Sequence, residues 1–115
     1  MAVNLAEKNI SDRIRLVTLD GTLDAPNAMA IEDEFESMLA QHTGYVIVDL
    51  SGVDYMSSYG LRMLLVGAKA LHGGEGGLYL AAPNEHVSKV ISVAGYDSMF
   101  PVYASVDEAV SALAV

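Results

Sequence analysis

The order of apolar and polar positions along the chain predicts strands that alternate with helices. Residues 45–50 form a short, almost continuous apolar run rich in β-branched side chains, which is typical of a strand covered on both faces. Ser51, Gly52 and Asp54 then indicate a turn, and from 61 to 71 the apolar residues recur at helical spacing. We therefore expect a central strand that leads through a turn into an amphipathic helix.

The same pattern assigns the rest of the chain. Alternating residues around a polar turn at 9–12 predict an N-terminal hairpin whose second strand ends at Gly21. Further helices are expected over residues 26–41, 84–94 and from 105 onward, and further strands over residues 78–81 and 99–103. Strands that alternate with helices imply a mostly parallel sheet, to which the hairpin adds an antiparallel edge. We predict one α/β domain spanning residues 1–115, with about five strands and about four helices.

The charge of the chain restricts the partners that it can bind. Six Lys and Arg residues stand against 15 Asp and Glu residues, which gives a net charge of −9. Because phosphate binding needs clustered positive charge, we expect no nucleic acid partner. A basic protein surface is the more natural partner.

Several features indicate a cytoplasmic protein. The chain has no cysteine, so disulfide and thiol chemistry are excluded. It has no run of 18 uncharged apolar residues, and its N-terminus lacks the basic and apolar regions of a signal peptide. We therefore expect no direct membrane insertion.

An acidic run covers one side of the expected helix 26–41, at Glu32, Asp33, Glu34 and Glu36. It is interpreted mainly as a solvated helix face with favourable charge near the helix N-terminus. The alternative is a docking surface for a basic partner.

Neither a cofactor nor a metal ion is expected. The glycines within 73–77 lack the Lys and Ser or Thr that end a phosphate-binding loop, and they lead from a helix to a strand. His42, His72 and His86 show no metal-ligand spacing, so they are interpreted as surface residues near helix ends.

The run from Thr18 to Asp24 resembles the signature of the haloacid dehalogenase phosphatases, in which two aspartates precede Gly-Thr. Thr18 stands at the position of the nucleophilic aspartate, and a threonine cannot form the aspartyl-phosphate or bind magnesium as a carboxylate does. A phosphohydrolase that depends on Asp20 is therefore the weakest hypothesis.

Ser57 and Ser58 lie where the expected central strand ends and the helix after it begins. A serine at this position commonly caps the helix by accepting a hydrogen bond from its first turn. An anion placed there meets free N–H groups and the positive end of the helix dipole. No His or acid at fixed spacing supports a nucleophilic serine.

The segment 49–65, DLSGVDYMSSYGLRMLL, resembles the signature of the STAS domain family, as found in bacterial anti-sigma factor antagonists. Residues 21–24 resemble the Gly-x-Leu-Asp of that family, and residues 95–109 resemble its C-terminal strand and helix. The order and length agree over essentially the whole chain, so the resemblance implies a STAS-like fold.

The resemblance also implies a regulatory binding module rather than an enzyme. In that family the unphosphorylated antagonist binds an anti-sigma factor that is also a serine kinase, and a serine phosphatase reverses the phosphorylation. By position, Ser58 is the implied phosphoacceptor. Ser57 and Tyr59 stand where the family more often has Asp and Ser or Thr, which leaves Ser57 as a second choice.

The predicted partner-binding residues are Asp24, Ser57, Ser58, Tyr59, Gly60 and Arg62. Asp24 is included because it should emerge at the same end of the sheet as Ser58 if the strands that precede them are parallel. Asp24 also has a plain interpretation as the cap of the helix that follows it. The alternative within the same fold is a non-phosphorylated STAS subunit of a larger complex, such as a lipid-transport ATPase assembly.

Overall fold

The structure is a computed structural model that describes residues 3–42, 44–71 and 77–113. Its elements, in chain order, are β1 (Asn4–Asn9), β2 (Ile14–Leu23), α1 (Ala25–Ala40), β3 (Tyr45–Met56), α2 (Ser58–Ala70), β4 (Leu78–Ala81), α3 (Glu85–Val93), the 3₁₀ turn η2 (Tyr96–Ser98), β5 (Val102–Tyr103) and α4 (Val106–Leu113).

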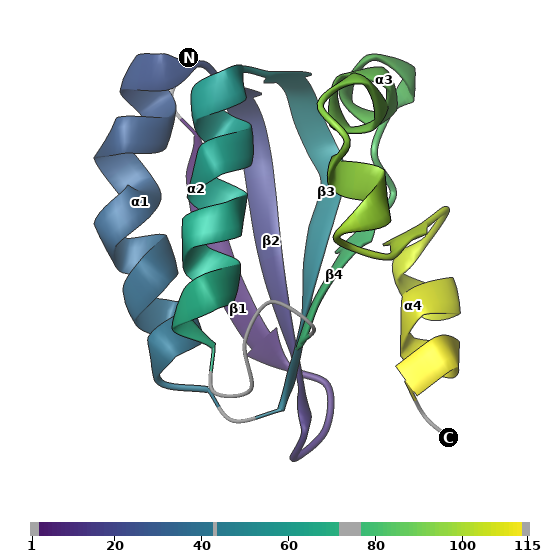
Figure 1. Ribbon diagram of the computed structural model, residues 1–115. Coiled ribbons are helices and arrows are strands. Elements are labelled where there is room, and N and C mark those ends of the chain that lie inside the picture. Colours follow the sequence, from purple (N-terminus) through teal and green to yellow (C-terminus); the bar gives the residue numbers. More distant parts are fainter. Residues whose placement is uncertain (1–2, 43, 72–76, 114–115) are drawn as a thin grey trace.

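The described strands form one five-stranded sheet in the order β1-β2-β3-β4-β5 (Figure 1). β1 and β2 pair antiparallel as a hairpin, and every other neighbouring pair is parallel. The predicted α/β architecture, with an antiparallel N-terminal edge and four helices, is confirmed.

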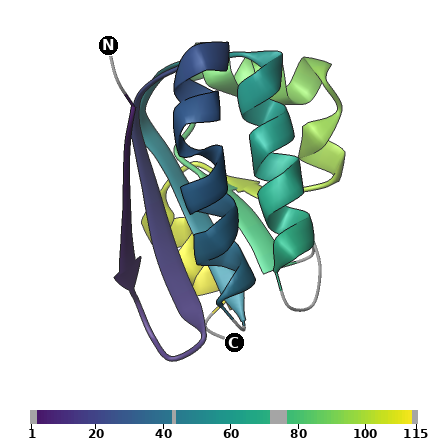
Figure 2. The same ribbon diagram turned by 90° about the vertical axis from the view of Figure 1, so that its left-hand side faces the viewer.

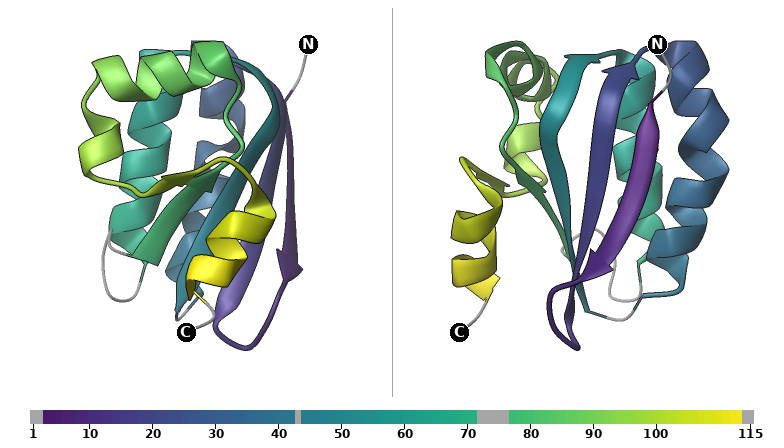
Figure 3. Two further views of the ribbon diagram at one scale, coloured as in Figure 1. Left: turned by 90° about the vertical axis from the view of Figure 1, so that its right-hand side faces the viewer. Right: turned by 180° about the vertical axis from the view of Figure 1, so that it is seen from behind.

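The helices lie on both faces and at one end of the sheet. α1 and α2 run side by side across one face (Figure 2), and α4 covers part of the opposite face (Figure 3). α3 lies beyond the carboxyl ends of β3 and β4, at the top of Figure 1. This end also carries the first turns of α1 and α2, so three helices begin near one edge of the sheet.

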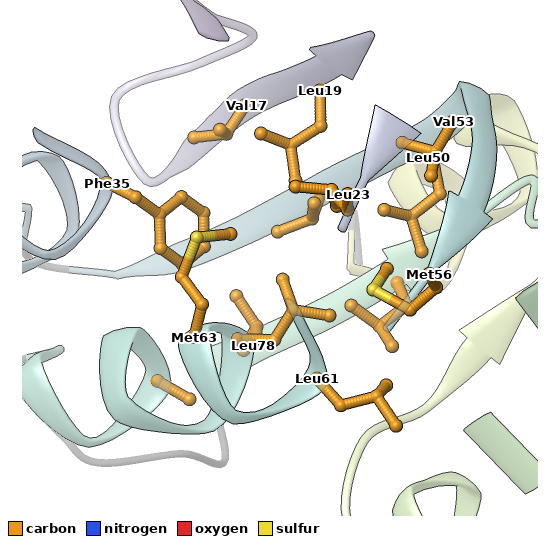
Figure 4. Packing of buried hydrophobic residues seen from close by; sticks show 14 of the residues in the cluster. Val17, Leu19, Leu23, Phe35, Leu50, Val53, Met56, Leu61, Met63 and Leu78 are labelled. Atoms are coloured by element: carbon orange, nitrogen blue, oxygen red, sulfur yellow. The ribbon is translucent and has the colours of Figure 1, made fainter. Parts of the chain in front are cut away.

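The central strand β3 is buried on both faces, as its apolar run predicts. Val46 and Val48 join the main core between the sheet and the α1–α2 layer, where Leu64 is fully buried. Phe35 of α1 and Met63 of α2 belong to the same core (Figure 4). Ile47 points to the other face and belongs to a smaller cluster under α4.

The turn predicted at Ser51, Gly52 and Asp54 is wrong, because β3 continues to Met56. β2 likewise continues past Gly21 to Leu23, and the two strands stay paired through irregularities in their register. The turn-forming residues are absorbed into a bulged strand in which Val53 and Met56 are buried and Tyr55 is exposed.

The side chains that precede the helices act as caps. Asp24 accepts a hydrogen bond from Asn27 N at 2.9 Å, and Asn84 accepts one from Val87 N at 2.7 Å. Ser105 caps α4 in the same way, by accepting a hydrogen bond from Glu108 N at 3.1 Å. Each cap fixes where its helix begins relative to the strand before it.

The expectation of surface histidines holds for His86, which is exposed, and is wrong for His42. His42 is only 6% exposed, and its Nε2 lies 2.9 Å from the carbonyl oxygen of Tyr45 and 3.3 Å from that of Arg13. Its ring thus ties the end of α1 to the start of β3. His72 and most of the glycine-rich loop lie outside the described residues.

Candidate functional site

The candidate site lies at the carboxyl edge of the sheet, where β3 passes into α2. Ser57 is the cap of α2, and its Oγ accepts a hydrogen bond from Gly60 N at 3.1 Å. The same hydroxyl donates to the carbonyl oxygen of Leu23 at 2.7 Å, and Ser57 N donates to that oxygen at 2.9 Å. Ser57 therefore has a structural role that occupies its hydroxyl as donor and acceptor.

Ser58 is the first residue of α2, and its environment is different. Its side chain is exposed, and within the described part of the chain its hydroxyl makes no hydrogen bond. Of the two serines, Ser58 is the one whose hydroxyl is available for chemistry.

Ser58 borders a shallow hollow of about 400 Å³ between α2 and α3. The residues that line it are mostly apolar, and they are Ser58, Leu61, His86, Lys89, Val90, Val93 and Ala94. Val93 is 80% exposed, so the wall contributed by α3 presents a large apolar side chain to solvent. An apolar surface beside an exposed polar group is a common feature of protein interaction sites.

Tyr59 points to the opposite side of α2, toward α1. Its hydroxyl donates to the Glu32 carboxylate, with 2.9 Å and 2.8 Å to the two oxygens. This hydrogen bond, with partial desolvation, raises the pKa of Tyr59 above its ordinary value. Glu32 of the acidic run is therefore a partner of Tyr59 rather than only part of a solvated face.

Arg62 lies on the same side as Tyr59. The two residues line a second hollow, of about 260 Å³, with Glu32, Asp33, Glu36, Met63 and Val66. The predicted site residues thus fall on two sides of α2, with Ser58 facing α3, and Tyr59 and Arg62 facing α1.

Asp24 and Gly60 occupy structural positions at the same edge. Asp24 caps α1, and its neighbour Leu23 pairs with Met56, which places Asp24 near the start of α2 as predicted. Gly60 is buried, and a Cβ atom there would lie 3.3 Å from the Leu23 carbonyl oxygen and 2.7 Å from Met56 Sδ. It lets the first turn of α2 pack closely on β2 and β3.

The α3 wall of the first hollow was not predicted from the sequence. His86, Lys89 and Val93 lie at helical spacing on the side of α3 away from the buried Val87 and Ile91. Their spacing, combined with the rule that helices after parallel strands start at one edge, is the signal that could have placed them beside Ser58.

The structure gives no support to the phosphohydrolase hypothesis. Thr18 and Asp20 lie within β2, and Asp24 is engaged as a helix cap, so these residues do not form a catalytic loop after a strand. Among the described residues, no group of three or more His, Cys, Asp or Glu side chains is placed to hold a metal ion.

A membrane-spanning helix is absent from the described parts of the chain. Within residues 3–42, 44–71 and 77–113, no helix is both long and apolar enough to cross a bilayer.

Comparisons with known proteins agree with the geometry. The family model of the STAS domain matches residues 6–109. BtrV of Bordetella bronchiseptica, which is assigned as an anti-sigma factor antagonist, is 35% identical over 101 residues, covering 88% of this chain and 87% of BtrV. A crystal structure of an anti-sigma factor antagonist from Mycobacterium paratuberculosis superposes with a TM-score of 0.88, at 24% identity over 99% of this chain and 96% of that one.

The fold is also that of SpoIIAA, an anti-sigma factor antagonist whose structure is known with and without phosphate. The unphosphorylated form superposes with a TM-score of 0.75, covering 93% of each chain. The phosphorylated Bacillus form superposes with a TM-score of 0.68, covering 94% of this chain and 97% of that one. Both are 20% identical to this chain, so they establish the shared fold alone. Together with the family match and the similarity to BtrV, the fold shows that the chain belongs to the STAS domain family, in the group of non-enzymatic regulatory proteins that contains the anti-sigma factor antagonists.

Proposed function

We propose that this protein is a phosphorylation-controlled binding module that antagonises an anti-sigma factor of the serine-kinase type. The unphosphorylated protein binds that partner in the cytoplasm and so prevents it from holding its sigma factor. Phosphorylation of Ser58 releases the partner, and a serine phosphatase restores the binding form. The similarity to anti-sigma factor antagonists supports this proposal.

One structural contrast carries the choice of Ser58 as phosphoacceptor. A kinase needs a hydroxyl oxygen that can attack the γ-phosphorus of ATP, so that an O–P bond forms, ADP leaves, and the hydroxyl proton passes to a base of the kinase. Ser58 is exposed, and no described residue engages its hydroxyl. Phosphorylation of Ser57 would instead break its hydrogen bonds to Leu23 and Gly60.

The position of Ser58 also explains how phosphate would act on binding rather than on folding. A phosphate adds about −1.5 to −2 charges, and the first turn of a helix tolerates negative charge. The fold should therefore be little affected. A partner that covers the apolar hollow would have to desolvate the dianion and leave it without a counter-charge. Leaving a charge buried and unpaired in an interface costs about 2–5 kcal/mol of binding free energy.

The proposed partner surface extends over both sides of the start of α2. The hollow beside Ser58 supplies apolar contacts through Leu61 and Val93. On the other side, Tyr59 and Arg62 supply polar contacts, and Asp24 supplies a carboxylate at the same edge. Ser57 and Gly60 contribute indirectly, by fixing the backbone of the first turn.

The test is to incubate the protein with ATP and each serine-kinase-like protein from its genome, and to locate phosphate by mass spectrometry. The Ser58→Ala variant should lose the modification, and the Ser57→Ala variant should retain it. Phosphate on Ser57 in the unaltered protein would overturn the assignment. Absence of phosphate with every kinase would favour the non-phosphorylated STAS subunit of a larger complex.

A further inference from the structure

Two positively ionisable side chains line the hollow that Ser58 borders, although the chain as a whole carries a net charge of −9. They are His86 and Lys89 of α3. Lys89 forms neither a hydrogen bond nor an ion pair within the described part of the chain, where the ion pair present joins Arg15 and Glu7. The charge of Lys89, beside the candidate phosphoacceptor, is thus not already neutralised.

Contacts hold His86, and the helix that carries Lys89, in place beside the start of α2. The ring of His86 stacks on that of Tyr55 in β3, with centroids 5.3 Å apart and 13° between the planes. The helix that carries them is anchored to the same strand, because Asn84 Nδ2 donates to the Val53 carbonyl oxygen at 3.1 Å. Since β3 leads directly into α2, the cationic side of α3 is positioned relative to Ser58 by the fold.

The carboxylates that could compete for these cations do not line the hollow. Glu85 lies one turn before Lys89 on α3 but forms no ion pair with it in the described structure. Asp54 of β3 accepts a hydrogen bond from Thr22 at 2.8 Å. A new anion on Ser58 would therefore be the negative group that shares the hollow with Lys89 and the ionisable ring of His86.

We propose that the phosphate on Ser58 is held within the protein by Lys89 and His86, so that phosphorylation closes the hollow between α2 and α3. The inference rests on the proposed phosphorylation of Ser58, and it adds how the phosphate changes the surface that a partner meets. Hydrogen bonds between a phosphate oxygen and a charged nitrogen are among the strongest that proteins make. The flexible Lys89 side chain would supply one, and the imidazolium of His86 another.

The consequence is a change in what the hollow offers to a partner. In the unmodified protein the lining of the hollow is mostly apolar, with Leu61, Val90 and Val93. If Lys89 and His86 hold a phosphate at its opening, an entering apolar side chain would have to displace charged, hydrated groups, which is unfavourable. Phosphorylation would thus block the hollow in the free protein, before any partner is met.

The test uses protein made with phosphoserine encoded at position 58, so that no kinase or partner is needed. The second pKa of the phosphate, about 6 when exposed, is followed by phosphorus NMR in the folded protein and in urea. We expect it to be lower in the folded protein by about half a pH unit or more, because nearby cations favour the dianion. Lys89→Gln should remove most of that difference, and Lys69→Gln, which makes the same charge change at the far end of α2, should not.

His86 gives a second, independent readout. Its imidazole pKa, followed by proton NMR, should be higher in the phosphorylated protein than in the unmodified one, and His86→Asn should raise the pKa of the phosphate. If Lys89→Gln and Lys69→Gln give the same phosphate pKa, and the pKa of His86 does not respond to phosphate, then Lys89 and His86 do not hold the phosphate. That result would leave the kinase experiment on Ser58 unaffected, so the two proposals fail separately.

Discussion

The hydroxyl of Ser57 donates a 2.7 Å hydrogen bond to the carbonyl oxygen of Leu23 and thereby joins the start of α2 to the end of β2. Because the same hydroxyl caps the helix, Ser57→Ala should lower the free energy of unfolding by about 1–2 kcal/mol. Ser58→Ala, at an exposed position, should change it by less than about 0.5 kcal/mol. Urea denaturation of the two variants measures the difference, and equal stabilities would contradict these separate roles.

The hydrogen bond between Tyr59 and Glu32 predicts an effect of pH. It raises the pKa of Tyr59, so the folded protein holds the phenolic proton more tightly than the unfolded chain. The stabilisation is complete below the ordinary pKa of tyrosine, and it is lost as the pH rises through the higher folded value. Glu32→Gln should bring the Tyr59 pKa back toward the ordinary value.

Absorbance of tyrosinate against pH measures that pKa, with Tyr59→Phe as the reference that isolates its signal from those of the other tyrosines. An identical titration in the Glu32→Gln variant would show that the carboxylate does not control Tyr59.

Most of the fold could be predicted from local patterns, because β3 and its covering helices carry clear periodicity. The prediction of a turn at Ser51, Gly52 and Asp54 failed because turn propensity is a local preference, and pairing of β3 with β2 as far as Met56 outweighs it. The prediction that His42 lies at the surface failed for a related reason. Nothing in its neighbourhood in the sequence indicates that carbonyl groups of Arg13 and Tyr45 surround its ring.

The site was predicted in part. Its centre at Ser57 and Ser58 follows from the pattern of strand and helix and from the family resemblance. The division of roles between the two serines depends on the carbonyl of Leu23, which lies 34 residues away in the chain. The contribution of α3 through His86 and Lys89 was missed, because no single segment of the sequence shows that this helix lies beside the start of α2.

Gly67 permits the close approach of α2 to α1. A Cβ atom at this position would lie 2.8 Å from Phe35 Cδ2 and 3.1 Å from Leu39 Cδ2, both in fully buried side chains. Gly67→Val should therefore lower the free energy of unfolding by about 1–3 kcal/mol through overpacking. Lys69→Val, at an exposed position of the same helix, is the control for the effect of a β-branched residue. Thermal or urea denaturation that finds both variants equally stable would contradict the packing.

Val93 tests the partner surface without disturbing the fold. Its side chain is 80% exposed in the wall of the hollow beside Ser58, so Val93→Asp should leave the free energy of unfolding almost unchanged. Affinity for the kinase-type partner should fall by about tenfold or more, which is about 1.4 kcal/mol. Ile10→Asp, in the turn after β1, is the matched control and should bind normally. Calorimetric titration that finds normal binding by Val93→Asp would exclude the hollow from the interface.

The central claim, that phosphate on Ser58 switches binding off, is tested most directly by comparing two forms of the protein against the same kinase-type anti-sigma factor. One form is unmodified, and the other carries encoded phosphoserine at position 58. We predict that both forms have the same circular dichroism spectrum and that phosphoserine weakens binding by about 100-fold, or about 2.7 kcal/mol. Equal affinities of the two forms would contradict the switch.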